Sequence, residues 1–319
     1  MSERTLVIGT RGSRLALAQA HAVEAALKAL GHTVRVEEIH TAGDRNTEQP
    51  LAALGGEGVF VKEIETALLR GSVDVAVHSY KDLPTVQPQG LAVVAVPERA
   101  DPRDFLVFRD SARGAAGAGT APTLRRLPTG TILGTGSPRR IAQALQLRPD
   151  LAWKEMRGNV ETRLRKWREG ECDALILAAA GLERLGLNPD GAPIAPDDML
   201  PAVGQGALAI EIRSDDAAAG RAAAALDHPP SASAVAAERA LLRRLGGGCR
   251  APIAAFATLE GERLLLRAVV ADGLGRQTLR GERRGDSRGA ADLGVALAED
   301  LLARGAAELL PRAPASGRP

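Results

Sequence analysis

The first hundred residues alternate short apolar runs with amphipathic stretches. Four apolar runs have the length and branched side chains of buried strands, at residues 5–9, 33–39, 73–77 and 91–97. Two stretches between them repeat apolar positions with helical spacing, residues 14–29 and 61–70. Gly31 marks the end of the first of these helices. The alternation predicts a doubly wound α/β domain, with a mostly parallel sheet between layers of helices.

The chain then repeats this arrangement. Strands are expected at 131–134, 152–156 and 173–178, with helices at 138–146 and 159–168. The strand-to-helix turn Gly9–Ser13 (GTRGS) resembles Gly134–Ser137 (GTGS), and a Gln-Ala pair follows each serine at the same spacing. The helix-to-strand turns GSVD at 71–74 and GECD at 170–173 are also alike. We therefore expect two similar α/β domains.

Residues after 228 follow a different order. A helix at 232–245 and a glycine turn precede three successive strands and a last helix, at 252–258, 263–270, 276–282 and 288–305. This order predicts a small α+β third domain. The expected domains are 1–101 with 206–226, then 105–200, then 229–319. Two segments without periodicity, 42–58 and 111–126, are expected to form a lid and a surface loop.

Composition excludes several classes of protein. Hydrophobic residues make up 45% and charged residues 25%, as in a globular chain. The net charge of +2 provides no overall basic field, so no nucleic-acid partner is expected. No stretch approaches the roughly 18 apolar residues of a membrane span, and the N-terminus has no export-signal pattern. Two widely separated cysteines exclude a disulfide framework, so we expect a cytoplasmic protein without a membrane partner.

Arginines gather at the strand-to-helix turns. Arg11 follows the first strand, Arg139 and Arg140 follow its counterpart, and Arg157 and Arg163 flank another such turn. Helix N-termini favour anions, and three hydroxyl side chains add donors there, Ser13, Thr135 and Ser137. Guanidinium groups bind carboxylates and phosphates through two oxygens at once. The pattern predicts several separate anion sites, whereas GxGxxG and GxxxxGK[ST] nucleotide motifs are absent.

The segment HSYKDLP at 78–84 directly follows a buried strand. Its Asp82 is a candidate general base or a partner for a cation, with a turn-capping role as the alternative. His78 is expected to be structural, because the five histidines lack HxH or HExxH spacing and no metal site is indicated.

The two cysteines differ in their surroundings. Cys172 precedes a buried strand and is expected to be a small apolar filler. Cys249 ends a triple-glycine turn, which lets the chain expose the sulfur, and the neighbouring Arg250 favours its thiolate form; an unreactive loop cysteine is the alternative. Cys249 is therefore the candidate reactive cysteine.

These segments and several others make the chain resemble the porphobilinogen deaminase family. Matching segments occur in that family's order between residues 9 and 253: GTRGSRLALAQA, HTAGD, FVKEIE, VDVAVHSYKDLP, the paired arginines, RGNVETRL, DALILAAAGLERLGL, LPAVGQGAL and GGGCRAPI. The resemblance implies three domains, the first two arranged like a two-domain periplasmic binding protein. It also implies a monomeric transferase with a dipyrromethane cofactor, joined through a thioether to Cys249. In the reaction that this resemblance implies, four porphobilinogens are added head to tail to the cofactor with loss of ammonia. Hydroxymethylbilane is then released by hydrolysis.

The resemblance also assigns roles to individual residues. Asp82 is the catalytic carboxylate, close to a pyrrole N–H and to the cationic charge that forms as ammonia leaves. The residues implied to hold the cofactor besides Cys249 and Asp82 are Ser13, Lys81, Thr135, Ser137, Arg139, Arg140 and Arg163. Those implied to bind substrate are Arg11, Arg157, Arg163 and Arg184. The chain departs from the family pattern at Glu57, Gly136 and Pro138.

Two other functions remain open. A non-catalytic two-domain anion-binding protein would account for the paired halves and the arginines, but not for Cys249 or the third domain. A cysteine-dependent hydrolase would use Cys249 with a distant histidine, and no further motif supports it.

Overall fold

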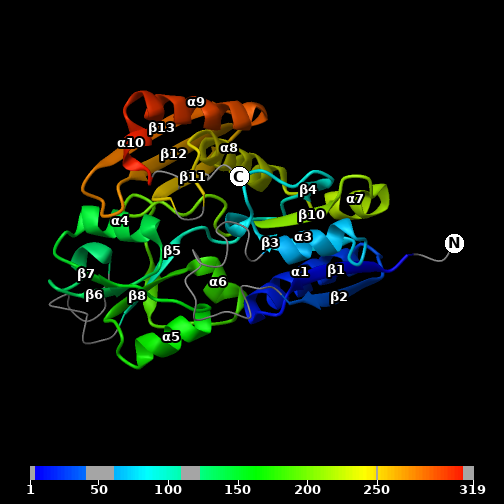
Figure 1. The fold of residues 1–319 in the computed structure, drawn as a ribbon, viewed down its shortest axis with the longest axis horizontal. Helices are drawn as coiled ribbons and strands as arrows, with labels where there is room; N and C mark the ends of the chain where they lie inside the picture. The colour runs from blue at the N-terminus through cyan, green and yellow to red at the C-terminus, as the bar shows by residue number, and fades with distance from the viewer. Residues whose placement is uncertain (1–3, 41–60, 109–122, 249–250, 312–319) are drawn as a thin grey trace, which may run out of the picture. The chain divides into compact units, whose positions relative to one another are not determined.

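A computed structural model describes residues 4–40, 61–108, 123–248 and 251–311 (Figure 1). The chain divides into two compact units. Unit 1 contains Met1–Pro102, Ala180–Asn188 and Gly204–Val235, and unit 2 contains Arg103–Ala179, Pro189–Val203 and Ala236–Pro319. The expected lid at 42–58, and most of the expected loop at 111–126, lie outside the described residues.

Unit 1 is built on a five-stranded sheet in the order β2-β1-β3-β10-β4. Its strands are β1 (Leu6–Arg11), β2 (Val34–Ile39), β3 (Val75–Ser79), β4 (Leu91–Ala95) and β10 (Leu208–Arg213). β1 pairs in parallel with β2 and β3, whereas β10 runs antiparallel to both β3 and β4. The helices of this unit include α1 (Arg14–Ala29), α3 (Lys62–Leu69) and α7 (Ala217–Ala224).

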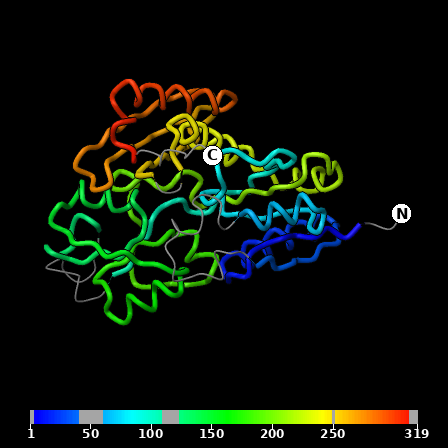
Figure 2. The backbone as a smooth tube through the Cα atoms, in the orientation of Figure 1, coloured from blue at the N-terminus to red at the C-terminus, as the bar shows by residue number. Residues whose placement is uncertain are grey.

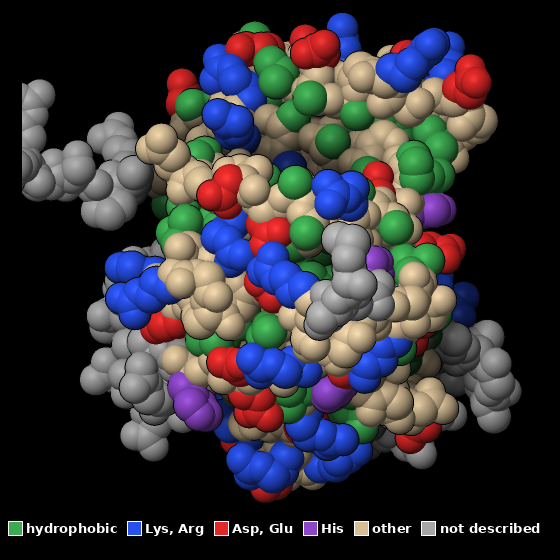
Figure 3. All heavy atoms as spheres, turned by 90° about the vertical axis from the view of Figure 1, so that its right-hand side faces the viewer, with side chains coloured by type: hydrophobic (Ala, Val, Ile, Leu, Met, Phe, Trp, Pro, Cys, Tyr) green, Lys and Arg blue, Asp and Glu red, His purple; other side chains and the backbone are tan. Residues whose placement is uncertain are grey.

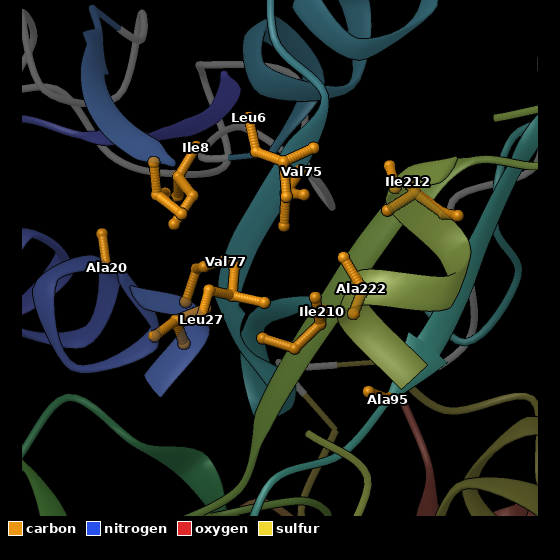
Figure 4. Close-up of a cluster of buried hydrophobic side chains, with 14 of the residues drawn as sticks. Leu6, Ile8, Ala20, Leu27, Val75, Val77, Ala95, Ile210, Ile212 and Ala222 are labelled. Carbon is orange, nitrogen blue, oxygen red and sulfur yellow. The ribbon is translucent and has the colours of Figure 1, made fainter. Parts of the chain in front are cut away.

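An apolar cluster of unit 1 lies between its sheet and helices α1 and α7. Ile8, Leu27 and Ile210 are fully buried within it. Figure 4 shows Leu27 of α1, Ile210 of the sheet and Ala222 of α7 pointing into this cluster. The Ser13 side chain accepts a hydrogen bond from the Ala16 amide at 3.3 Å, which begins α1 immediately after β1. Packing and capping together fix the turn between β1 and α1.

Unit 2 contains a second five-stranded sheet, in the order β7-β6-β8-β5-β9. Its strands are β5 (Asp104–Phe108), β6 (Ile132–Gly134), β7 (Ala152–Lys154), β8 (Ala174–Ala178) and β9 (Gly191–Pro193). β6 is parallel to β7 and β8, and β5 is antiparallel to β8 and β9. Helices α4 (Pro138–Leu147) and α5 (Val160–Arg168) follow β6 and β7, and α6 (Ala179–Arg184) follows β8 and continues into unit 1. Each strand therefore has a counterpart in unit 1 with the same neighbours and direction.

The two similar turns seen in the sequence form the same contacts. The Asp74 carboxylate accepts a hydrogen bond from the Val7 amide at 3.0 Å, and the Asp173 carboxylate accepts one from the Ile132 amide at 2.8 Å. In both units the aspartate amide also donates back to the same partner residue, at 2.8 and 2.9 Å. Together with the strand order, this confirms the prediction of two similar doubly wound domains.

The C-terminal part of unit 2 forms a three-stranded antiparallel sheet. It consists of β11 (Ile253–Glu260), β12 (Arg263–Ala271) and β13 (Thr278–Asp286), with helices α8 (Pro229–Arg244), α9 (Ala290–Ala303) and α10 (Ala306–Leu309). α8 begins in unit 1 and ends in unit 2. The small α+β part expected from the sequence is therefore present, and Figure 2 traces its path in yellow, orange and red.

All the predicted helices and strands are present to within a few residues, whereas β5, β9, β10, α6, α7 and α10 were not predicted. None of the helices in the described ranges has both the length and the apolar character needed to cross a membrane. On the face drawn in Figure 3, Lys and Arg side chains stand among Asp and Glu side chains.

Gly294 provides a test of the packing between α8 and α9. A Cβ at this position would overlap the Ala237 carbonyl oxygen and the Leu241 amide, both backbone atoms of α8. We expect Gly294→Ala to destabilise the protein by roughly 1–3 kcal/mol, because the overlap outweighs the gain in helix propensity. Thermal unfolding measures the effect.

The control is Gly220→Ala in α7, where the nearest obstacle is a side-chain methyl of Ile212 at 3.3 Å. This variant should match or exceed the stability of the parent protein. Equal melting temperatures for the two variants would contradict the packing argument.

Candidate active site

An open pocket lies in unit 1, where β1 and β3 end. Its polar lining residues are Thr10, Arg11, Ser13, Gln19, His78, Ser79 and Asp82. The carboxyl ends of parallel strands are where open α/β sheets bind ligands. The structure therefore brings together Arg11, Ser13 and Asp82, three residues that the sequence selected from segments about seventy positions apart.

The loop that carries Lys81 and Asp82 is held from both sides. Ser79 Oγ is hydrogen-bonded to the buried Gln19 of α1 at 2.8 Å, and the Tyr80 amide donates to the Ala207 carbonyl at 3.0 Å. Lys81 Nζ donates to Gln205 Oε1 at 3.3 Å. The segment VGQGAL before β10 thus fixes the 3₁₀ turn Tyr80–Asp82 at the pocket.

Gln205 is a residue that sequence reasoning missed. It is 1% exposed, and its Nε2 donates to the Pro102 carbonyl at 2.8 Å while its Oε1 accepts from Lys81. Its position between two glycines with positive φ, Gly204 and Gly206, could have singled it out, because such turns often serve a site. It orients the Lys81 ammonium group.

In unit 2, Thr135 and Ser137 shape the turn into α4. Thr135 is 1% exposed, and its Oγ1 accepts a hydrogen bond from the Ser137 amide at 3.2 Å. Pro138 occupies the first turn of α4, where its fixed φ suits a helix start and its missing N–H costs no hydrogen bond. Gly136 keeps this turn close to the Met156 carbonyl, which would lie 3.1 Å from a Cβ. The two departures from the family pattern here therefore preserve a helix start.

Arg139 and Arg140 share one fully buried carboxylate, that of Asp104. Arg139 donates to it at 2.6 and 3.1 Å, and Arg140 donates at 3.0 and 2.8 Å. Each guanidinium also donates to a backbone carbonyl, of Leu200 and Ile176 respectively. Both arginines are about 5% exposed. Two cations on one anion leave an uncompensated positive charge near the start of α4.

Asp104 was not predicted from the sequence, because it begins a strand whose existence was itself missed. Burial lowers the pKa of Arg140, and the neighbouring charge of Arg139 lowers it further, whereas Asp104 raises it. Asp104 is thus the carboxylate that pairs with both buried guanidinium groups and fixes their orientation. Their role toward a ligand stays a prediction.

The remaining candidates are distributed among other elements. Arg157 is paired with Glu155 at 2.6 Å, both about half exposed, and Arg163 lies within α5. Arg184 ends α6, and its Nη2 donates to the Gly206 carbonyl at 2.7 Å. Burial lowers the pKa of Arg184, while Glu183 raises it.

Of the two cysteines, Cys172 lies within the described residues and Cys249 does not. Cys172 is 2% exposed and packs where a Cβ at Gly134 would lie, as expected of an apolar filler. Cys249 and Arg250 lie outside the described residues. Within the described ranges, no cluster of three His, Cys, Asp or Glu side chains is arranged to hold a metal ion.

The Asp104 cluster predicts a large stability effect. Asp104→Ala should cost roughly 3–5 kcal/mol, because it leaves two buried like charges without their counterion. The control is Asp197→Ala, which removes an 84% exposed partner of Arg267 and should cost less than about 1 kcal/mol. Chemical denaturation of both variants checks this, and similar losses would contradict the assigned role of Asp104.

Residues 6–221 match the family model described as porphobilinogen deaminase, dipyromethane cofactor binding domain, and residues 232–303 match its C-terminal domain. The chain is 49% identical to the porphobilinogen deaminase of Roseiflexus sp. (strain RS-1), over 97% of this chain and 99% of that one. It is also 49% identical to that of Acidothermus cellulolyticus, over 98% and 93% of the two chains.

Among solved structures, substrate binding domain 2 of Lactococcus lactis GlnP overlaps with a TM-score of 0.44 at 11% identity, over 77% of this chain and 92% of that one. The family models and full-length relatives carry the assignment: the chain belongs to the porphobilinogen deaminase family.

Proposed function

We propose that this chain is a transferase that joins four porphobilinogen molecules head to tail with loss of ammonia. It forms hydroxymethylbilane on a dipyrromethane group carried by Cys249. The observation that carries the proposal is the unit 1 pocket, in which Asp82 faces the same space as Arg11 and Ser13. Membership of the porphobilinogen deaminase family supports it.

The residues of this pocket fit a carboxylated pyrrole. Such a ligand needs cations and hydroxyl donors for its acetate and propionate groups, and an acceptor for its ring N–H. Arg11 and the Ser13 hydroxyl are donors, and the Asp82 carboxylate is an acceptor. When bound, dipyrromethane supplies the pyrrole ring to which the first substrate is joined.

Asp82 is the proposed catalytic residue. Its carboxylate accepts the pyrrole N–H and stabilises the positive charge that develops on the ring as ammonia departs. This stabilisation needs a fixed carboxylate, because reorienting a group during the reaction costs part of the free energy by which it stabilises the transition state. The hydrogen bonds of Ser79, Tyr80 and Lys81 support such a fixed position.

The other site residues bind carboxylates in this proposal. Besides Cys249 and Asp82, the cofactor is held by Ser13, Lys81, Thr135, Ser137, Arg139, Arg140 and Arg163. The substrate and growing chain are bound by Arg11, Arg157, Arg163 and Arg184. Arg139 and Arg140 contribute mainly through the positive charge they leave beside the α4 N-terminus, since most of their N–H groups serve Asp104 and backbone carbonyls.

We further propose that the chain folds as the three domains 1–101 with 206–226, 105–200 and 229–319. It would act as a monomer in the cytoplasm. The non-catalytic anion-binding alternative gains no support from the family match, which spans a cofactor-binding domain and a C-terminal domain.

The role of Asp82 predicts a large loss of turnover. Asp82→Asn should lower the rate of hydroxymethylbilane formation by about 10²-fold or more, because a neutral amide stabilises the cationic charge far less. Its melting temperature should stay near that of the parent, since Asp82 lies in an exposed turn. Asp197→Asn serves as the matched control, and normal turnover of Asp82→Asn would exclude the assignment.

The covalent anchor predicts a defined mass. Purified protein should exceed its sequence mass by two deaminated porphobilinogen units, and Cys249→Ser should lack this excess in intact-mass spectrometry. Cys172→Ser is the control and should keep it, because Cys172 is buried. Protein that stayed unmodified after incubation with porphobilinogen would overturn the proposed function.

A further inference from the structure

His78 lies in the wall of the unit 1 pocket, near the end of β3 and just before the 3₁₀ turn Tyr80–Asp82. It is 5% exposed. In the antiparallel register of β3 with β10, His78 is opposite Ala209 and Glu211 is opposite Ala76. Because side chains alternate along a strand, Ala76, His78 and Glu211 share one face of the sheet. Ala76 packs against Ile64 and Leu68, so this is the face covered by α3.

Glu211 is buried without the partners that a buried carboxylate ordinarily has. It is 0% exposed, and its Oε2 lies 3.1 Å from His78 Nε2. Among the described residues, its Oε1 has no hydrogen-bond partner. A buried acidic group with one partner costs more free energy than an apolar side chain of similar size. Packing alone therefore does not account for a glutamate here.

The surroundings of Glu211 add to this cost. Glu65 of α3 faces the same region, and its Oε1 also lacks a partner among the described residues. Burial raises the pKa of Glu65, the charge of Glu211 raises it further, and His78 lowers it. The Nε2 atom of His78 is the hydrogen-bond partner that Glu211 has beneath the pocket.

The pairing decides which ring nitrogen carries a proton. A carboxylate only accepts hydrogen bonds, so His78 Nε2 is the donor in this pair. In the neutral imidazole, Nδ1 then presents a lone pair. Nδ1 is also the ring nitrogen that Glu211 leaves available, on a side chain that lines the pocket.

We propose that His78 Nδ1 accepts a hydrogen bond from an N–H group of the pyrrole ligand, beside Asp82, and that Glu211 is the positioning residue that fixes the imidazole. The inference rests on the proposed function. It gives the pocket two acceptors for N–H groups, Asp82 and His78, and two donors for carboxylates, Arg11 and Ser13. It also replaces the purely structural role expected for His78 from the sequence.

Two substitutions at His78 separate this role from a structural one. Asn places its amide oxygen as many bonds from Cα as Nδ1, so His78→Asn keeps the acceptor and loses the contact with Glu211. Gln places its amide nitrogen as many bonds from Cα as Nε2, so His78→Gln keeps the contact and loses the acceptor.

The proposal predicts opposite orders for activity and stability. His78→Gln should lower kcat/KM for porphobilinogen by about tenfold and melt near the parent. His78→Asn should keep kcat/KM within about threefold and melt at a lower temperature, because Glu211 is left unpaired. The control is His21→Gln on the exposed face of α1, where the side chain is 60% exposed, and it should change neither quantity. If His78→Gln retained both more activity and more stability than His78→Asn, the role of His78 would be structural and the proposal would be wrong.

A spectroscopic measurement tests the same idea without turnover. In protein with ¹⁵N-labelled histidine, the His78 signals are assigned by their loss in His78→Asn. The resting holoenzyme should show a protonated Nε2, and addition of porphobilinogen should shift the Nδ1 resonance more than the Nε2 resonance. A protonated Nδ1 beside a bare Nε2, or an Nδ1 signal unchanged by substrate, would overturn the proposal. Parent protein that formed no hydroxymethylbilane would instead overturn the proposed function.

Discussion

The antiparallel pairing of β10 with β3 is the constraint on which the pocket depends. β3 carries His78 and Ser79 to the carboxyl end of the parallel strands. β10 supplies Glu211 against His78, and the residue just before β10, Ala207, supplies a carbonyl against the Tyr80 amide. Both contacts fail if the register moves by one residue, because every side chain then changes face. A strand from the far end of the α/β sequence thus sets the geometry of a loop formed near its beginning.

Two buried carboxylates of this fold pair with side chains from other elements. Asp104 begins β5 under the two arginines of α4, and Glu211 lies near the middle of β10 under His78. The apolar clusters between sheet and helices hold aliphatic side chains, as Figure 4 shows for unit 1. The favourable free energy of this apolar packing can therefore offset the cost of burying polar groups. These buried polar groups lie next to the residues proposed to bind carboxylates and N–H groups.

The proposed chemistry needs little from the protein beyond fixed charge and hydrogen bonds. Ammonia loss creates a cation, and the growing product is a polyanion. The unit 1 pocket accordingly offers a carboxylate, and the turn before α1 offers a hydroxyl, a guanidinium group and a helix N-terminus. In unit 2, the turn before α4 offers the same kinds of group. The duplicated fold provides two such turns from one type of α/β unit.

The sequence by itself determined the local elements and the chemistry. Apolar periodicity located the strands and helices that it named, because spacing along the chain is a local property. The similar turns at Asp74 and Asp173 revealed the duplication, since each forms the same contact with the strand before it. Motifs around Asp82 and Cys249 indicated the family that the full-length relatives support.

Only the tertiary structure decided which strands run antiparallel and which buried charges meet. β5 and β10 are short apolar runs whose direction depends on distant partners, and they escaped prediction for that reason. Glu211 lies 133 positions from His78, and Asp104 lies 35 positions from Arg139. No local pattern encodes such pairs, because a buried carboxylate is tolerated only where the folded chain brings a hydrogen-bond donor to it.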